Sequence, residues 1–534
     1  IHGCSLKQNV LKPNGSTYTA SRAADFLQSG DKNFRPINLR WGPAGDIYVI
    51  DWHDQNPCHQ TNPDDWDYTR GRVYRVQLKG TKAKKPDDLA ALDLKALVKA
   101  VGADDPYRWR TALRLLGEKK LDGEARTAAA LAARETPPPL SRAAWFANAI
   151  SPITGELAAK YQVPDERAKS MGAEFVPFAR VMGECPDLQP KTIDTFTRIA
   201  ALTASPALRR EFASVAVRHA DRLDVTQLLR ALMSHKEDAK DPVISQLVWL
   251  AYEKALASGG RKPAAPAPAP PAPKNEQPAD AVRSPVETEL TWLAEQAPAN
   301  EFVRDQIVPK VMRRLVALDT PESIKQCVGF VAKLKDAASR EKALEGLSVA
   351  TQGRTINAPE GWAELKAEID KDNNPKVVAL ANKLSVSFRD PAAIKRALDA
   401  AGNAQLPVEA RAEAVRQLAA LKPAEGVKLL IGLLSDESAG LGNEAARALA
   451  AFDQKELPGV LVANWGTYPK GVRPDLVNTL ASHKHSAKAL LEAMLSKKID
   501  RGEVTDNVIL RVQAFKDKEL EALIAKAWGR TRPT

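Results

Sequence analysis

Apolar residues recur at helical spacing from about residue 88 to the end of the chain. Val427, Leu430, Ile431 and Leu434 follow the i, i+3, i+4, i+7 pattern of one helix face. A second window repeats the spacing at Ala445, Leu449 and Phe452. Ala, Leu, Lys, Glu and Arg dominate the same region, so we expect a mainly α-helical protein.

Polar residues followed by proline mark the start of several of these helices. The polar side chain caps free backbone amides, and proline fits the first helical turn. The pairs are Asp105-Pro106, Ser205-Pro206, Asp241-Pro242, Thr320-Pro321 and Asp390-Pro391. Short helical segments with short connections, such as "SPALRREFASVAVRHA", favour an α-solenoid of HEAT type, and a single compact helix bundle is the alternative.

The chain divides into four segments by composition. Its 534 residues exceed what one hydrophobic core usually supports. Residues 1–80 have the short runs and turns of β structure, and "IYVID" predicts a strand buried on both faces of a sheet. Residues 88–257 and 287–534 are the two expected helical lobes. Residues 258–286 are rich in Pro and Ala and predict an extended linker.

Charge and cysteine usage narrow the function classes. The net charge is +11, but acidic and basic residues are interspersed, so a nucleic-acid partner is not favoured. No apolar run is long enough for a transmembrane segment. Neither CxxC nor CxxCH occurs, so this span predicts no zinc ribbon and no attached c-type haem.

The residues best suited to a site lie between positions 35 and 59. Asp51, His53, Asp54 and His59 have the chemistry of metal or cofactor ligands, and Ca²⁺ is one candidate. We assign Asp54 and His59 to a metal, and Arg35, Asp51 and His53 to a cofactor. For Arg35, the residue pattern alone favours a surface ion pair over an anionic cofactor or substrate.

Other polar and aromatic residues in this region have a structural alternative. The carboxylates of "NPDDWD" (Asp64, Asp65 and Asp67) are typical of a solvated turn, with a hard-cation site as the alternative. Trp41, Trp52 and Trp66 favour packing within the β module over a sugar platform. Cys4 and Cys58 could form a disulfide in an oxidising compartment.

Two groups of residues in the helical region have a structural interpretation. Cys185 and Cys327 lie in helical patterns and are expected to be buried apolar residues. His483 and His485 are spaced i, i+2, which does not place them on one helix face, so we do not expect a metal pair there.

Several segments resemble one family. "FRPINLRWGPAGDIYVIDWHD" followed by "GRVYRV" looks like a blade of a sugar-dehydrogenase-like β-propeller, and "IVPKVMRRLVAL", "EKALEGLSVATQGR" and "VNTLASH" extend the similarity. Together they resemble the large planctomycete and verrucomicrobial proteins called membrane-bound dehydrogenases. In those proteins a signal peptide and a propeller precede HEAT repeats and a cytochrome c domain. The chain is then an internal fragment that lacks most of the propeller and the haem domain.

The resemblance implies an exported protein, periplasmic or secreted, that oxidises a sugar or alcohol. A quinone cofactor similar to PQQ, or Ca²⁺, would belong to the propeller, and haem c only to the missing C-terminal domain. The solenoid would act as a scaffold between these parts. The alternative is a non-enzymatic HEAT-repeat scaffold that binds a protein partner on the solenoid surface.

Overall fold

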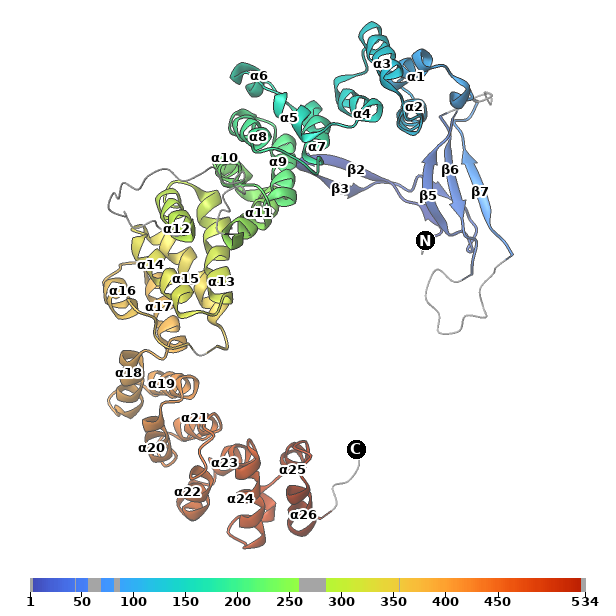
Figure 1. Ribbon diagram of the computed structural model, residues 1–534. Helices are drawn as coiled ribbons and strands as arrows, with labels where there is room; N and C mark the ends of the chain where they lie inside the picture. Colours follow the sequence, from blue (N-terminus) through green and yellow to red (C-terminus); the bar gives the residue numbers. More distant parts are fainter. Residues whose placement is uncertain are drawn as a thin grey trace, which may run out of the picture. The chain divides into compact units, whose positions relative to one another are not determined.

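A computed structural model describes residues 3–43, 45–55, 69–80, 87–258, 285–354 and 356–529 (Figure 1). The chain forms two compact units, Ile1–Ile307 and Val308–Thr534. The first unit holds a small β module and helices, and the second is helical. The expected fold class is confirmed: the protein is mainly α, with a HEAT-like solenoid preceded by a small β segment.

The β module consists of short antiparallel pairs. Strands β5, β6 and β7 form one sheet in that order, β2 pairs with β3 as a hairpin, and β1 pairs with β4. The strands are β1 (Ser5–Leu6), β2 (Asn9–Asn14), β3 (Thr17–Arg22), β4 (Leu27–Gln28), β5 (Pro36–Trp41), β6 (Ile47–Asp51) and β7 (Arg72–Val76).

Strand β6 is not buried on both faces, contrary to the expectation for "IYVID". Val49 is buried, but Ile50 is exposed on the opposite face, beside Ile37 of β5 and Val73 of β7, which are exposed too. The reason is that no described layer of the chain covers this face of the sheet.

In the first unit, helices stack so that α7 packs on α9, α9 on α11, and α8 on α10. This alternation of neighbours is the packing of a helical repeat. The helices are α1 (Leu94–Val101), α2 (Pro106–Glu118), α3 (Gly123–Glu135), α4 (Leu140–Ile150), α5 (Gly155–Lys160), α6 (Asp165–Lys169), α7 (Val176–Gly183), α8 (Pro190–Leu202), α9 (Pro206–His219), α10 (Thr226–Met233), α11 (Ile244–Ser258) and α12 (Pro285–Gln296), followed by the π-helical turn η5 (Phe302–Ile307).

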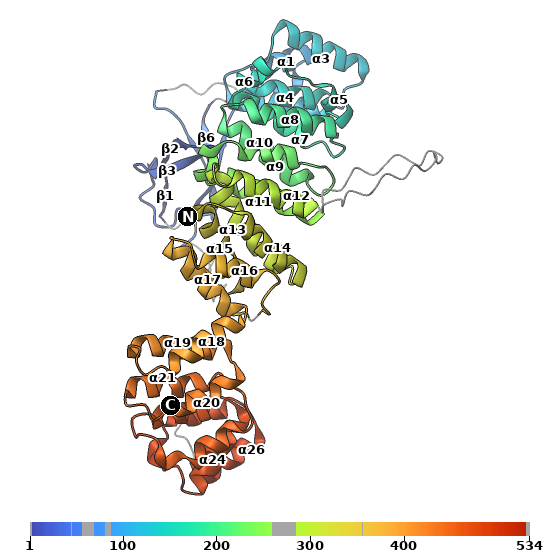
Figure 2. The ribbon, with the colours of Figure 1, turned by 90° about the vertical axis from the view of Figure 1, so that its left-hand side faces the viewer.

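The second unit repeats this packing: α13 contacts α15, and α15 contacts α17 (Figure 2). Further along the chain, α22 contacts α24. A continuous apolar core runs through α18 to α26. The helices are α13 (Val308–Ala317), α14 (Pro321–Lys333), α15 (Ala337–Thr351), α16 (Trp362–Ile369), α17 (Pro375–Ser387), α18 (Pro391–Gly402), α19 (Val408–Leu421), α20 (Ala424–Leu433), α21 (Ala439–Leu449), α22 (Leu457–Ala463), α23 (Arg473–Leu480), α24 (Lys484–Leu495), α25 (Asp506–Gln513) and α26 (Lys518–Ala527).

The predicted helix starts are confirmed. Asp105, Ser205, Thr320 and Asp390 are N-caps whose side chains accept a hydrogen bond from the first turn, each followed by proline. Asp241 likewise accepts from the backbone N–H groups at the start of α11. These starts were predictable because capping depends on three or four consecutive residues.

A recurring arginine ties successive repeats together. Each of these residues donates to a backbone carbonyl five to ten positions earlier. Each also donates to a carboxylate 25 to 32 positions later. We call them the staple arginines, and their pairs are Arg209–Asp238, Arg340–Asp372, Arg411–Asp436 and Arg473–Glu503. A solenoid is held by such nearest-neighbour contacts.

The two helical cysteines, Cys185 and Cys327, are buried as expected. Among the described residues, none of the helices has the length and apolar character that crossing a bilayer requires.

Candidate functional site

The sequence-predicted residues Arg35, Asp51, His53 and Asp54 come together at one end of the β5–β6 pair. The register places Pro36 of β5 opposite Asp51, the last residue of β6. Arg35 and His53 are 4% exposed, Asp54 is 2% exposed and Asp51 is 1% exposed. Four polar residues are therefore buried within a small β module, which calls for a physical explanation.

Asp51 organises the backbone around itself. Its Oδ1 accepts a hydrogen bond from the backbone N–H of Arg35 at 2.7 Å and from that of His53 at 2.9 Å. The Trp52 N–H donates to the carbonyl of Arg35 at 3.1 Å and continues the pairing past the end of the strand. Asp51 thus joins the entry to β5 to the exit from β6.

His53 has a left-handed backbone with φ 54°. This conformation is uncommon for a residue other than glycine and costs about 1–3 kcal/mol unless the surroundings enforce it. Here the Asp51 hydrogen bond enforces it, and His53 Nε2 lies 3.3 Å from Asp31 Oδ2. The N–H of Asn33 first, and then His53 and Arg72, hold the pKa of the Asp31 carboxyl below its ordinary value.

Arg35 connects distant parts of the module. Its Nη1 lies 2.8 Å from the Sγ of Cys4 and donates to the Phe34 carbonyl at 3.2 Å. Its Nη2 donates to the carbonyl of Gln55 at 2.9 Å. The surface ion pair considered for Arg35 is therefore wrong, because the side chain is buried and bonds to carbonyls and a thiol.

Three buried atoms of the cluster make no hydrogen bond within the described structure: Arg35 Nε, Asp51 Oδ2 and His53 Nδ1. Leaving such an atom without a partner costs about 1–3 kcal/mol. Asp51 Oδ2 faces Arg72 Nη1, but at 3.9 Å, which is beyond hydrogen-bond distance. The cluster therefore has unused donor and acceptor capacity.

The described residues do not by themselves fit the groups that the resemblance implies. Ca²⁺ takes about six to eight oxygen ligands. The described part of the chain holds no set of three or more His, Cys, Asp or Glu side chains placed for a metal ion. The two Nη atoms of Arg35 are already engaged by protein groups, so they do not present a free fork to an anionic quinone.

Several predicted residues lie outside the described residues: His59, Cys58, the three carboxylates Asp64, Asp65 and Asp67, and Trp66. The assignment of His59 to a metal and the Cys4–Cys58 disulfide therefore stay predictions. Trp41 and Trp52 are described, and both are exposed on the β module.

His483 and His485 do come together, contrary to the spacing argument. Their rings stack with centroids 6.0 Å apart, and the Nδ1 atoms lie 3.7 and 3.4 Å from Asp453 Oδ1. The argument failed because His483 is the extended N-cap of α24, outside the helix to which the i, i+2 rule applies. Their Nε2 atoms contact backbone carbonyls, as structural histidines do.

An apolar groove lies in the first helical lobe, between α4, α5 and α7. It encloses about 470 Å³ and is lined mainly by apolar and aromatic side chains: Ala147, Ile150, Ile153, Leu157, Ala158, Tyr161, Phe178 and Met182. The rings of Tyr161 and Phe178 pack with centroids 4.6 Å apart. Burial raises the pKa of the Tyr161 hydroxyl above its ordinary value. We call this the α4–α7 groove.

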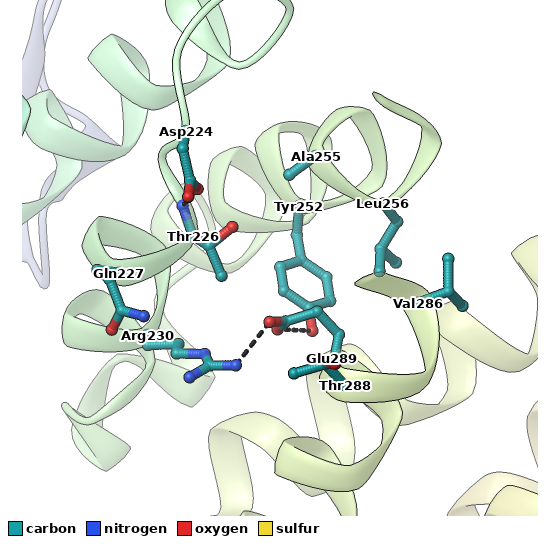
Figure 3. Close-up of a pocket in the computed structure, with 10 residues that line it drawn as sticks. All are labelled: Asp224, Thr226, Gln227, Arg230, Tyr252, Ala255, Leu256, Val286, Thr288 and Glu289. Atoms are coloured by element: carbon teal, nitrogen blue, oxygen red, sulfur yellow. Dashed lines mark hydrogen bonds and ion pairs between the residues drawn. The ribbon is translucent and has the colours of Figure 1, made fainter. Parts of the chain in front are cut away.

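A second hollow of about 360 Å³ is lined by polar and apolar residues alike and contains an ion pair (Figure 3). Arg230 and Tyr252 point toward the carboxylate of Glu289, which accepts from Arg230 Nη2 at 2.6 Å and from the Tyr252 hydroxyl at 2.8 Å. Burial, and then Glu289, raise the pKa of Tyr252 well above its ordinary value. The hydrogen bonds of Arg230 and Tyr252 to Glu289 connect α10, α11 and α12.

Neither the α4–α7 groove nor the staple arginines were found from sequence. The groove is formed by buried, partly buried and exposed residues from three short helices and the connection between two of them, for which a periodic pattern gives no separate signal. The arginines could have been suspected from an acidic residue that follows each about 30 positions on, one repeat length away.

Comparison with known proteins gives limited matches. Residues 5–80 match a family described as a domain of unknown function, DUF7133. A search of curated proteins finds no match. Similar solved structures include the karyopherin Kap121p bound to Pho4p and bound to the SUMO protease Ulp1p, each with 15% identity over 81% of this chain and a TM-score of 0.38. An engineered protein matches 82% of this chain, with 16% identity and a TM-score of 0.22. The chain spans 49% of the length of the Kap121p chains.

Proposed function

We propose that this chain is a non-enzymatic scaffold that binds a protein partner through its helical repeats. The observation that carries the proposal is the α4–α7 groove, an apolar surface within a stack of short helices. Exposed apolar surface is costly to keep in water, and where it is contiguous it often marks a binding site. Helical repeats commonly present such grooves to extended or helical segments of other proteins.

The groove has the features of a site for a partner's apolar side chain. Tyr161 and Phe178 supply flat aromatic walls, and the buried Met182 completes the lining. Leu157 stands at the edge and is 53% exposed, so a bound segment would cover it. Lys160 adds one positive charge to the lining. A segment with one or two large apolar anchors and an acidic flank fits this chemistry.

The test is site-specific photo-crosslinking in cells of the source organism. A photoreactive phenylalanine analogue is placed at Leu157, and in a matched variant at Leu131 of α3, which is exposed to the same extent, 53%. We expect a defined adduct at position 157 that is absent at position 131. The adduct should disappear when Phe178→Glu is added, while the helical circular dichroism is retained. The same adducts at both positions, or persistence with Phe178→Glu, would overturn the proposal.

A second function, that of an exported dehydrogenase-like protein, has one observation in its favour. The β5–β7 sheet exposes apolar side chains on both faces: Ile37, Ile50 and Val73 on one, and Trp41 and Tyr74 on the other. A blade packed between neighbouring blades of a propeller would cover both faces. This supports a propeller origin, from which sugar or alcohol oxidation, a quinone cofactor, haem c and a periplasmic or secreted location follow only by family resemblance.

The redox proposal is tested on the full-length parent protein. Purified protein should show haem absorbance and reduce a dye with sugars or alcohols after addition of a quinone cofactor. A parent protein with neither haem absorbance nor dye reduction would refute this second function and leave the scaffold proposal standing.

A further inference from the structure

The hairpin β2–β3 is solvated along its length. Val10, Leu11 and Tyr18 are all exposed, and the remaining strand residues are at most half-buried. Within the first unit it runs from the β module toward the helices around α9 (Figure 1). An isolated two-stranded hairpin is at best marginally stable in water. A contact at the tip of the hairpin must therefore stabilise it.

The tip is buried against the helical lobe. Ser16 is 4% exposed, and its N–H donates to Asp241 Oδ2 at 2.6 Å while its hydroxyl donates to Asp241 Oδ1 at 2.9 Å. Arg210 of α9 donates from Nη1 to the Ser16 carbonyl at 2.6 Å. All three polar groups of one serine are thus recognised by residues about 200 positions away in the sequence.

Asp241 performs two tasks with one carboxylate. Besides binding Ser16, its Oδ1 accepts from the backbone N–H groups of Val243 and Ile244 and so caps the start of α11. Charge-assisted hydrogen bonds of this kind are roughly twice as strong as neutral ones. The Asp241 carboxylate therefore both caps α11 and binds the tip of the hairpin.

The contact also requires glycine before the serine. Gly15 has φ +59°, and a Cβ there would lie 2.2 Å from Asp241 Oδ2. A left-handed φ at the first position of a two-residue loop is what a type II′ hairpin needs. The Gly15-Ser16 pair is thus matched to the surface formed by Arg210 and Asp241.

We propose that Arg210 and Asp241 form an intramolecular docking site for the Gly15-Ser16 tip. Docking of the tip fixes the β module to the first helical lobe, and we call this contact the latch. When the tip is seated, the hairpin is ordered and its position is set by the start of α11. When the tip is released, the hairpin loses its support, although α11 keeps its cap. This inference does not depend on either proposed function.

Hydrogen–deuterium exchange of the full chain tests the latch. Gly15→Ala removes the fit, and Gly30→Ala is its matched control, because Gly30 also has a positive φ but nothing lies near its added Cβ. Asp241→Asn keeps an oxygen for the helix cap but turns an amide N–H₂ toward the Ser16 N–H.

We expect exchange in residues 9–22 to rise at least about tenfold in Gly15→Ala and in Asp241→Asn, and to stay at the wild-type rate in Gly30→Ala. Protection of α11 should be unchanged in Asp241→Asn, which distinguishes release of the latch from loss of the cap. The proposal is overturned by wild-type protection of residues 9–22 in both variants. It is overturned equally if the hairpin is unprotected in the wild type, or if α11 loses protection together with it in Asp241→Asn.

Discussion

Replacing Arg209 tests how strongly a staple arginine holds the solenoid. Arg209 and Asp238 side chains are 2% and 4% exposed, and they form two parallel contacts, Nε to Oδ2 at 2.6 Å and Nη2 to Oδ1 at 2.7 Å. Arg209 Nη1 also donates to the Thr203 carbonyl at 3.0 Å. Arg209→Met keeps most of the volume but leaves the Asp238 carboxylate buried, while the other charged residues of its own turn, Lys236, Glu237 and Lys240, are exposed.

Breaking a buried pair by removing one partner costs about 3–5 kcal/mol. At about 1.4 kcal/mol per tenfold change, this predicts amide exchange in α9, α10 and the Asp238 turn that is roughly 140- to 3700-fold faster. Exchange is the suitable assay because a chain with two units has no single unfolding free energy. The effect should fade within the first unit and be absent from α20 to α26, since solenoid repeats couple to their neighbours.

Two further variants decide whether the charge is the cause. Arg209→Met with Asp238→Leu removes both partners and should recover most of the protection, because an apolar pair can replace a buried ion pair. Arg114→Met removes an exposed pair with Glu118 and should change exchange by less than about threefold. If Arg209→Met changes exchange no more than Arg114→Met does, the staple argument is wrong.

Three other predictions follow from packing and burial. Gly346→Ala should destabilise the second unit by about 1–3 kcal/mol and lower its thermal midpoint, because the new Cβ would lie 2.4 Å from the Pro309 carbonyl oxygen where α15 crosses α13. Gly329→Ala, on an exposed part of α14 with free space around it, should raise that midpoint through better helix propensity. Midpoint shifts in the same direction for both variants would contradict this prediction. Burial raises the pKa of Cys327 to about 12, so its thiol should resist alkylation at pH 8 in the native protein and react after denaturation, as mass spectrometry would show. Burial alone would raise the pKa of Asp241, but the hydrogen bonds that its carboxylate accepts from N–H groups hold this pKa below its usual value of 3.8. Docking of the hairpin should therefore be intact above pH 3.8 and be lost as the pH falls through the lowered pKa. The measurement is amide exchange in residues 9–22, corrected for intrinsic rates, and protection that persists in acid would contradict the prediction.

The parts of the fold that depend on neighbouring residues were predictable. Helix starts at proline pairs and the apolar faces of α20 and α21 follow local rules. The end of a helix is less predictable: α21 ends at Leu449, whereas the apolar pattern in the sequence continues to the buried Phe452. Gly15-Ser16 between two β-prone runs is also a local hairpin signal, because glycine is the first residue of the two-residue loop.

The long-range contacts were not predictable from one sequence. Asp51 and His53 are predicted from sequence because they lie together at the end of one strand, and Arg35 because it lies at the entrance to the preceding strand. Nothing local indicates that Ser16 meets Asp241, 225 positions away. The exposure of both sheet faces was missed for a related reason: a strand pattern shows that its side chains are suited to burial, but not whether anything covers them.

The staple arginines also bear on where this chain tolerates insertions over evolution. The Pro- and Ala-rich segment between α11 and α12 lies after Asp238 and before Arg340. It therefore falls outside all four spans from an arginine to its carboxylate. An insertion inside a span would have to preserve the contact between an arginine and its carboxylate. Outside the spans this constraint is absent, and the segment between α11 and α12 has to leave the contacts of Arg230 and Tyr252 with Glu289 in place. Sites for fusing a tag or a reporter domain are best chosen by the same criterion.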